Sequence, residues 1–227
     1  MKIFAIVPVK RFEKGKSRLS PLLNIDERKK LSELLLDDTL SILLRTTAIC
    51  EVIVVSSDNR AKEIAERFGA KYLKENKDSG VNKAVALADS YSSQSGAEAT
   101  LVIPQDLPLL RPEDIDIMCE AAEEHERCLI ICPSLKYDGT NALLRRPSSL
   151  LKTHYDNNSY NMHIKIARKI GADIRIFLSR RIMIDIDTIE DIENLLKESS
   201  RSRAIAYIKS ALDFDSAAFN RYSLYKD

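Results

Sequence analysis

The amino-acid sequence predicts an α/β protein with a mostly parallel sheet. Short apolar runs of strand length alternate along the chain with longer stretches whose apolar residues recur every three or four positions. Several of the short runs are apolar at every position, which is typical of strands buried on both faces of a parallel sheet. The sequence shows no internal repeat and no linker that would divide it.

Seven stretches are predicted to be strands because most of them are short, apolar and rich in β-branched residues. The first is closed by Pro8 and the fourth ends at Pro104, because a proline cannot continue a ladder of backbone hydrogen bonds. In chain order the predicted strands are residues 3–9, 52–55, 71–73, 101–103, 129–132, 174–177 and 183–187.

The stretches between these runs are predicted to be helices with one apolar face. Pro112 fits a first helical turn, Thr188 precedes acidic residues that favour a helix start, and Gly69 and Gly171 are typical helix ends. Residues 92–96 are predicted to be a surface loop. The helices are predicted over residues 26–44, 60–68 and 79–91, from residue 112, over residues 161–170, from residue 188, and over residues 204–212.

The composition is typical of one globular domain with an even charge balance. Among the 227 residues, 35 lysines and arginines face 34 aspartates and glutamates, so no net charge favours nucleic acid or a membrane surface as partner. The cysteines show no zinc-binding spacing, and no apolar run is long enough to span a membrane, so we expect a cytoplasmic protein. The main domain is predicted over residues 1–199, and residues 200–227 either cap it or form a homodimer contact.

Asp106 is the first candidate for a functional residue. Because Pro104 should end the strand before it, Asp106 lies just past the carboxyl end of that strand. In open α/β sheets, ligands bind at this edge. The alternative is that Asp106 makes only a local backbone bond in a turn.

Two further aspartates, Asp185 and Asp187, form the second candidate group. Residues two apart in a strand share a face, so both carboxylates should point the same way while Ile184 and Ile186 point into the core. Like charges on one face repel unless a cation lies between them, and Mg²⁺ commonly binds one or two carboxylates together with substrate phosphates. The alternative is a solvated strand edge. With Asp106 as a third acid, the sequence favours a Mg²⁺ site.

The loop that follows the first strand carries five basic residues over residues 10–19. Its position after a strand would place Lys10, Lys16 and Arg18 where they can hold a triphosphate and stabilise leaving pyrophosphate. The alternative is an exposed charged loop. The sequence contains neither of the glycine-rich phosphate-binding signatures, GxxxxGK[ST] and GxGxxG, and its histidines show no metal-ligand spacing.

Six motifs, taken in order, carry a resemblance that covers residues 3–191. The chain resembles the 2-phospho-L-lactate guanylyltransferase family, which serves the biosynthesis of the deazaflavin coenzyme F-420. The motifs are Ile6-Val7-Pro8-Val9-Lys10, Lys16-Ser17-Arg18-Leu19, Gly80-Val81-Asn82, Pro104-Gln105-Asp106-Leu107-Pro108-Leu109, Gly139-Thr140-Asn141-Ala142-Leu143 and Asp185-Ile186-Asp187-Thr188.

The resemblance implies a single-domain nucleotidyltransferase fold, a Rossmann-like and GT-A-like three-layer sandwich shared with molybdenum-cofactor guanylyltransferases. It implies transfer of GMP from GTP to a small phosphorylated three-carbon acid, with release of pyrophosphate. The acid would be 2-phospho-L-lactate, phosphoenolpyruvate or 3-phosphoglycerate. Two rival functions stay open: a cytidylyl- or sugar-phosphate transferase of the same fold, and a non-catalytic nucleotide-binding regulator.

The resemblance also assigns roles to individual residues. Asp156 stands where the family often has a glycine, and we assign it no role. By resemblance, Asp106, Asp185 and Asp187 would hold Mg²⁺, and Lys10, Lys16 and Arg18, with Asp106, would be catalytic. Asn82 would lie near the guanosine, and Thr140 and Ser159 would lie near the acceptor. Ser17, Gly80 and Asn141 would also bind substrate.

Overall fold

In the computed structural model of the protein, seven strands form one sheet in the order β3-β2-β1-β4-β6-β5-β7. The structure describes residues 1–197 and 202–214. β6 is antiparallel to both of its neighbours, and the other paired strands are parallel. The α/β class and the mostly parallel sheet are therefore confirmed. The strands are β1 (Ile3–Pro8), β2 (Ile49–Ser56), β3 (Lys71–Lys74), β4 (Ala99–Val102), β5 (Cys128–Pro133), β6 (Thr140–Arg146) and β7 (Asp173–Ile176).

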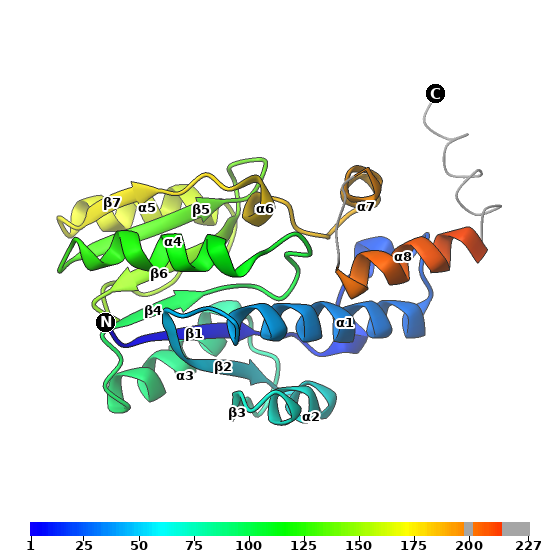
Figure 1. Cartoon of the computed structure of the whole chain (residues 1–227), viewed down its shortest axis with the longest axis horizontal. Coiled ribbons are helices and arrows are strands. Elements are labelled where there is room, and N and C mark those ends of the chain that lie inside the picture. The colour runs from blue at the N-terminus through cyan, green and yellow to red at the C-terminus, as the bar shows by residue number, and fades with distance from the viewer. Residues whose placement is uncertain (198–201, 215–227) are drawn as a thin grey trace.

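Helices cover both faces of the sheet, which confirms the three-layer sandwich (Figure 1). One face packs against α1 (Ile25–Leu43), α2 (Asn59–Arg67) and α4 (Pro112–Glu123). The other face packs against α3 (Val81–Gln94) and α5 (Ser159–Lys169). The remaining helical segments are η1 (Phe12–Lys14), η2 (Ser17–Leu19), α6 (Arg180–Met183), α7 (Ile189–Leu196) and α8 (Arg203–Phe214).

A third group of buried side chains lies beyond the end of the sheet. In this group, Leu31 and Leu35 of α1 pack with apolar side chains of α7 and with Ile205 and Ile208 of α8. The C-terminal helix therefore packs on its own chain, whereas the tail from residue 215 lies outside the described residues. Of the described helices, none has the length and apolar character that crossing a membrane requires.

Local sequence signals account for several helix starts. The side chain of Asn24 accepts hydrogen bonds from the backbone N–H groups of Asp26 and Glu27, and Glu27 bonds back to the N–H of Asn24. Pro112 occupies the first turn of α4, where its missing N–H would have no partner anyway. The hydroxyl of Thr188 caps α7 together with Asp191.

Three sequence predictions of local structure are wrong. Residues 183–187 do not form a strand: α6 ends at Met183, and an extended segment follows that does not join the sheet. α3 runs to Gln94, so residues 92–94 of the predicted loop are helical, and Ser92 is buried. α5 begins at Ser159, two residues earlier than predicted.

Candidate active site

Two loops meet at the carboxyl ends of the central strands. β1 pairs with β2 on one side and with β4 on the other, so the chain connections leave β1 in opposite directions. The carboxylate of Asp58, at the end of β2, accepts from the backbone N–H of Phe12 over 2.9 Å. The hydroxyl of Thr39, on α1, donates to the carbonyl of Gln105 over 3.0 Å. These bonds fasten the basic loop to the end of β2 and the Asp106 loop to α1.

The two loops enclose a cavity of about 330 Å³. Six of the predicted site residues line it, so the structure brings these six together at this edge of the sheet. They come from the basic loop, the loop after β4 and the extended segment before α7. The lining residues are Pro8, Lys10, Lys14, Gly15, Lys16, Ser17, Arg18, Val81, Pro104, Gln105, Asp106 and Asp187.

Lys16 lies between two of the carboxylates. Its Nζ donates to Asp106 Oδ2 over 2.6 Å and to Asp187 Oδ1 over 3.0 Å, and its side chain is only 6% exposed. Its backbone adopts the left-handed region, with φ of 53°, which is uncommon for a residue other than glycine. Burial lowers the pKa of Lys16, but the charges of the two carboxylates outweigh it and raise the pKa, so the ammonium stays charged.

The alternative of a uniformly exposed loop is therefore wrong. Lys10 and Arg18 are exposed along the cavity wall, as an exposed loop would have them, but Lys16 turns inward. A buried ammonium is stable only when it is paired, and Asp106 and Asp187 supply that pair. The basic loop thus combines one inward cation with outward cations at the cavity.

Asp185 belongs to the same electrostatic group. The backbone N–H of Ile186 donates to the carbonyl of Asp106 over 3.1 Å, which ties the two acidic segments together. Burial, and then the charges of Asp106 and Asp187, raise the pKa of Asp185 to about 7, although the Lys16 ammonium opposes this shift. Ile184 and Ile186 are buried, so the predicted alternation is right although the segment is not a strand.

The three carboxylates suit a divalent cation by charge and by donor chemistry. In the described part of the chain, no three histidine, cysteine, aspartate or glutamate side chains lie close enough together to form a complete protein cage for a metal. Mg²⁺ does not need one, because it commonly takes one or two carboxylates together with substrate phosphates. Among the described residues, the Lys16 ammonium is the one cation that bonds to Asp106 and Asp187 and whose charge acts on Asp185. A divalent cation would balance the remaining negative charge of the three carboxylates.

Binding of Mg²⁺ is expected to release a proton from Asp185. With a pKa of about 7, this carboxyl is about half protonated at pH 7, and a cation beside it favours the ionised form. Isothermal titration calorimetry with Mg²⁺ in two buffers of different ionisation enthalpy should therefore report release of about half a proton at pH 7. Release should fall above pH 7, where the carboxyl is already ionised.

The control for this titration is Asp173→Asn, at the start of β7 and 65% exposed in its side chain. That variant should release the same fraction of a proton as the wild type, whereas Asp185→Asn should release none. A binding heat that does not depend on the buffer in the wild type would contradict the expected role of Asp185.

Asn82 and Asp156 face each other at the start of α3. Asn82 Oδ1 accepts from the backbone N–H of Tyr155 over 2.7 Å, and its Nδ2 donates to Asp156 Oδ2 over 3.1 Å. Gly80 precedes α3 with φ of 90°, a conformation that favours glycine. Both ends of the Asn82 amide thus hold the segment before α5, and the aspartate that departs from the family pattern is one of its partners.

The predicted acceptor residues lie at the starts of β6 and α5, outside the cavity lining. The hydroxyls of Thr140 and Ser159 are 3.1 Å apart. Asn141 Nδ2 donates to the carbonyls of Ile182 and Met183 over 2.9 and 3.2 Å. Asn141 therefore fastens β6 to the segment that leads into Asp185.

Sequence reasoning missed the residues that hold this site in place. Asp58 and Thr39 fix the two loops, and Asp114 fixes α6 by accepting from Ser179 and Arg181 over 2.7 to 2.9 Å. Asp58 could have been found, because it lies three residues after the end of a predicted strand. The partners of Asp114 are more than sixty residues away in the sequence, and no local pattern indicates them.

Comparisons with known proteins agree with this geometry. Residues 1–223 match the model of the family described as guanylyl transferase CofC like. The chain belongs to this family. The resemblance inferred from the motifs is therefore confirmed, and with it the expectation of an enzyme that transfers nucleotidyl groups.

Two curated relatives of the CofC-like chain cover nearly its whole length. The phosphoenolpyruvate guanylyltransferase of Conexibacter woesei is 32% identical and covers 94% of this chain and 96% of its own length. The 2-phospho-L-lactate guanylyltransferase of Methanobrevibacter smithii is 28% identical and covers 91% of this chain and 89% of its own length. A solved structure from Desulfovibrio desulfuricans, described as a nucleotide-diphospho-sugar transferase, has a TM-score of 0.78 at 16% identity. The match covers 98% of this chain and 99% of that chain, and it supports the fold.

Proposed function

We propose that the protein transfers GMP from GTP to a small phosphorylated three-carbon acid, with release of pyrophosphate, in the biosynthesis of coenzyme F-420. The observation that carries the proposal is the Lys16 ammonium held between Asp106 and Asp187 in a cavity whose wall also presents Lys10 and Arg18. Such a mixed group of anions and cations suits a metal-bound triphosphate. The family and the names of the curated relatives support the same reaction.

In this mechanism a phosphate oxygen of the acid attacks the α-phosphorus of GTP in line with the leaving pyrophosphate. No general base is required, because a phosphate monoester is largely ionised near neutral pH. Lys10 and Arg18 stabilise the negative charge of the leaving pyrophosphate. Asp106, Asp185 and Asp187 would hold Mg²⁺, which when bound supplies further neutralisation of phosphate charge.

A substrate screen tests the proposal directly. Pyrophosphate release should be measured with each of the four common nucleoside triphosphates against 2-phospho-L-lactate, phosphoenolpyruvate and 3-phosphoglycerate. We expect release only with GTP and with one or two of these acids, and only when Mg²⁺ is present. Release with CTP instead would support the cytidylyl rival, and GTP binding without release in any combination would support a regulator.

Replacing Arg18 by alanine is expected to raise the KM for GTP about 10- to 100-fold, because a hydrogen bond to a charged phosphate is worth about 1.5–3 kcal/mol. Because Arg18 is exposed, the substitution should change the free energy of unfolding of the protein by less than about 0.5 kcal/mol. Steady-state kinetics and urea denaturation measure the two quantities. Arg11→Ala, in the same loop but paired with Glu13 and not part of the cavity lining, is the matched control. Equal KM values for GTP in both variants would show that Arg18 does not bind phosphate.

A further inference from the structure

His163 is a buried histidine that the mechanism above does not use. It lies on α5, and its side chain is fully shielded from solvent. The ring of Tyr155 packs edge-on against its imidazole, with 5.2 Å between the ring centroids. A buried histidine is often only a satisfied core residue, so its role depends on what its two ring nitrogens contact.

The contacts of Nε2 determine which nitrogen carries the ring proton. The backbone N–H of His154 donates to Nε2 over 2.9 Å, and a backbone N–H can only donate. Nε2 therefore presents a lone pair, and the proton of the neutral ring is on Nδ1. Burial, followed by the charges of Arg145 and His154, lowers the pKa of His163 to about 3, so the ring stays neutral near pH 7.

The proton on Nδ1 orients a pair of hydroxyls. Nδ1 lies 3.1 Å from Thr140 Oγ1, which in turn lies 3.1 Å from Ser159 Oγ. When His163 donates to Thr140, one of the two hydroxyl protons forms the bond between Thr140 and Ser159. The other hydroxyl proton then points outward and takes no part in these hydrogen bonds. With the opposite tautomer, Thr140 would donate to the ring and Ser159 to Thr140, and neither proton would be free.

The outward proton has no hydrogen-bond partner in the part of the chain that the structure describes. Thr140 and Ser159 are 5% and 4% exposed, and among the described residues neither hydroxyl makes a further hydrogen bond. A shielded donor without an acceptor is costly, so an anion placed here would be stabilised. Thr140 adjoins Asn141, which binds the segment leading into Asp185, so the hydroxyl pair lies at the same edge of the sheet as the acids.

We propose that His163 is a positioning residue that holds the Thr140–Ser159 pair as a hydrogen-bond donor toward the carboxylate or phosphate of the acceptor acid, a role that rests on the proposed function. His163 acts through Thr140 and does not touch the acid. Its effect should therefore fall on the acceptor and not on the nucleotide, because Thr140 and Ser159 do not line the cavity that is proposed to hold the triphosphate.

Two conservative variants separate the ring nitrogens. The amide of His163→Gln reaches toward the Nε2 position and keeps an acceptor for the His154 N–H, but it removes the donor to Thr140. The shorter amide of His163→Asn stays near the Nδ1 position and keeps that donor. We expect kcat/KM for the acid to fall about 10- to 100-fold in His163→Gln and to be largely restored in His163→Asn, with the KM for GTP unchanged in both. His154→Ala keeps its backbone N–H and is the matched control, expected to behave as wild type.

A double-mutant cycle shows whether His163 acts through Thr140. Thr140→Val deletes the hydroxyl that His163 orients, so adding His163→Gln to it should cause little further loss. Independent, additive losses, unchanged acceptor kinetics in His163→Gln, or an equal rise of the KM for GTP would each overturn the proposal.

Nitrogen-15 NMR of the wild-type protein tests the tautomer without any variant. We expect a proton on Nδ1 of His163 and no titration between about pH 5 and 8; a proton on Nε2 would overturn the proposal even if the glutamine variant does not fold. Calorimetric binding of phosphoenolpyruvate to wild type and to Thr140→Val gives a second readout, with weaker binding expected in the variant. The proposed function fails separately, if the wild type releases no pyrophosphate in the substrate screen.

Discussion

Replacing Asp106 by asparagine is expected to lower kcat/KM for GMP transfer by at least about a hundredfold, because loss of a charge that holds a catalytic metal costs several kcal/mol of barrier. The substitution keeps the shape of the side chain and one acceptor for the Lys16 ammonium, so the fold should stay intact. Kinetics at saturating Mg²⁺ and a circular dichroism melt measure the two effects. Asp187→Asn should behave in the same way, because Asp187 shares the ammonium.

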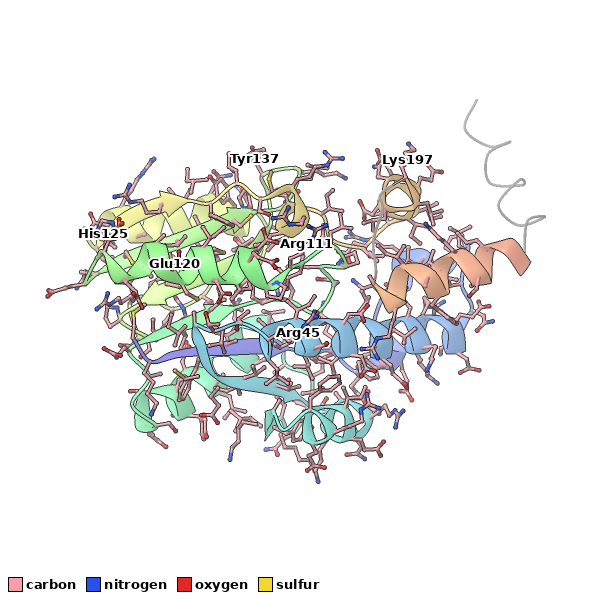
Figure 2. The ribbon with its side chains drawn as sticks, in the orientation of Figure 1. Arg45, Arg111, Glu120, His125, Tyr137 and Lys197 are labelled. Atoms are coloured by element: carbon pink, nitrogen blue, oxygen red, sulfur yellow. The ribbon has the colours of Figure 1, made fainter. Side chains whose placement is uncertain are left out.

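The matched control for Asp106→Asn is Asp173→Asn. Asp173 pairs with His125, which Figure 2 shows at the end of the molecule away from α7 and α8. We expect full activity in this control. Activity near the wild-type level in Asp106→Asn, with unchanged dependence on Mg²⁺, would contradict the assignment of Asp106 to the metal.

The elements that could be predicted from the sequence are those that depend on local patterns. The strand before Pro104 ends where a proline must end it, and Asp106 follows at the carboxyl edge as predicted. Asn24 with Glu27 forms a capping box within one turn, so α1 begins close to the predicted residue. In both cases the partners lie within a few residues of each other.

The segment over residues 183–187 shows where a local pattern is insufficient. Its alternation of acidic and apolar residues correctly predicted that Ile184 and Ile186 are buried. A period of two indicates alternating burial, but it does not indicate what covers the buried face. Here α1, α7 and α8 cover it instead of a neighbouring strand, so the segment is extended without belonging to the sheet.

The site was only partly predictable for a similar reason. The sequence placed Lys16 in a basic loop, but its burial depends on Asp106 and Asp187, which are 90 and 171 residues away. Similarly, the ring proton of His163 depends on a backbone group of the segment before α5 and on the first residue of β6. Such contacts follow from the tertiary fold, and a single sequence read locally does not contain them.

Arg145 is the clearest case of a residue that only the fold explains. It lies in β6 with its side chain fully buried, and its guanidinium donates to both carboxylate oxygens of Asp89, on α3, over 2.6 and 2.8 Å. It also donates to Thr100 Oγ1 over 2.8 Å and to the carbonyl of Leu151 over 3.2 Å. These bonds join β6, β4, α3 and the segment before α5, on the face of the sheet that carries His163.

Replacing Arg145 by methionine is therefore expected to lower the free energy of unfolding by about 3–5 kcal/mol, because removing one partner of a buried pair leaves the other uncompensated. Urea denaturation should show a lower midpoint with an unchanged slope. Adding Asp89→Leu should recover most of the loss, since two apolar side chains can replace a buried ion pair at little cost. Arg60→Met, which breaks a surface pair with Glu33 and Glu63, is the control and should cost less than about 1 kcal/mol. If the Arg145 and Arg60 variants lost similar stability, the pair with Asp89 would not be what holds these elements together.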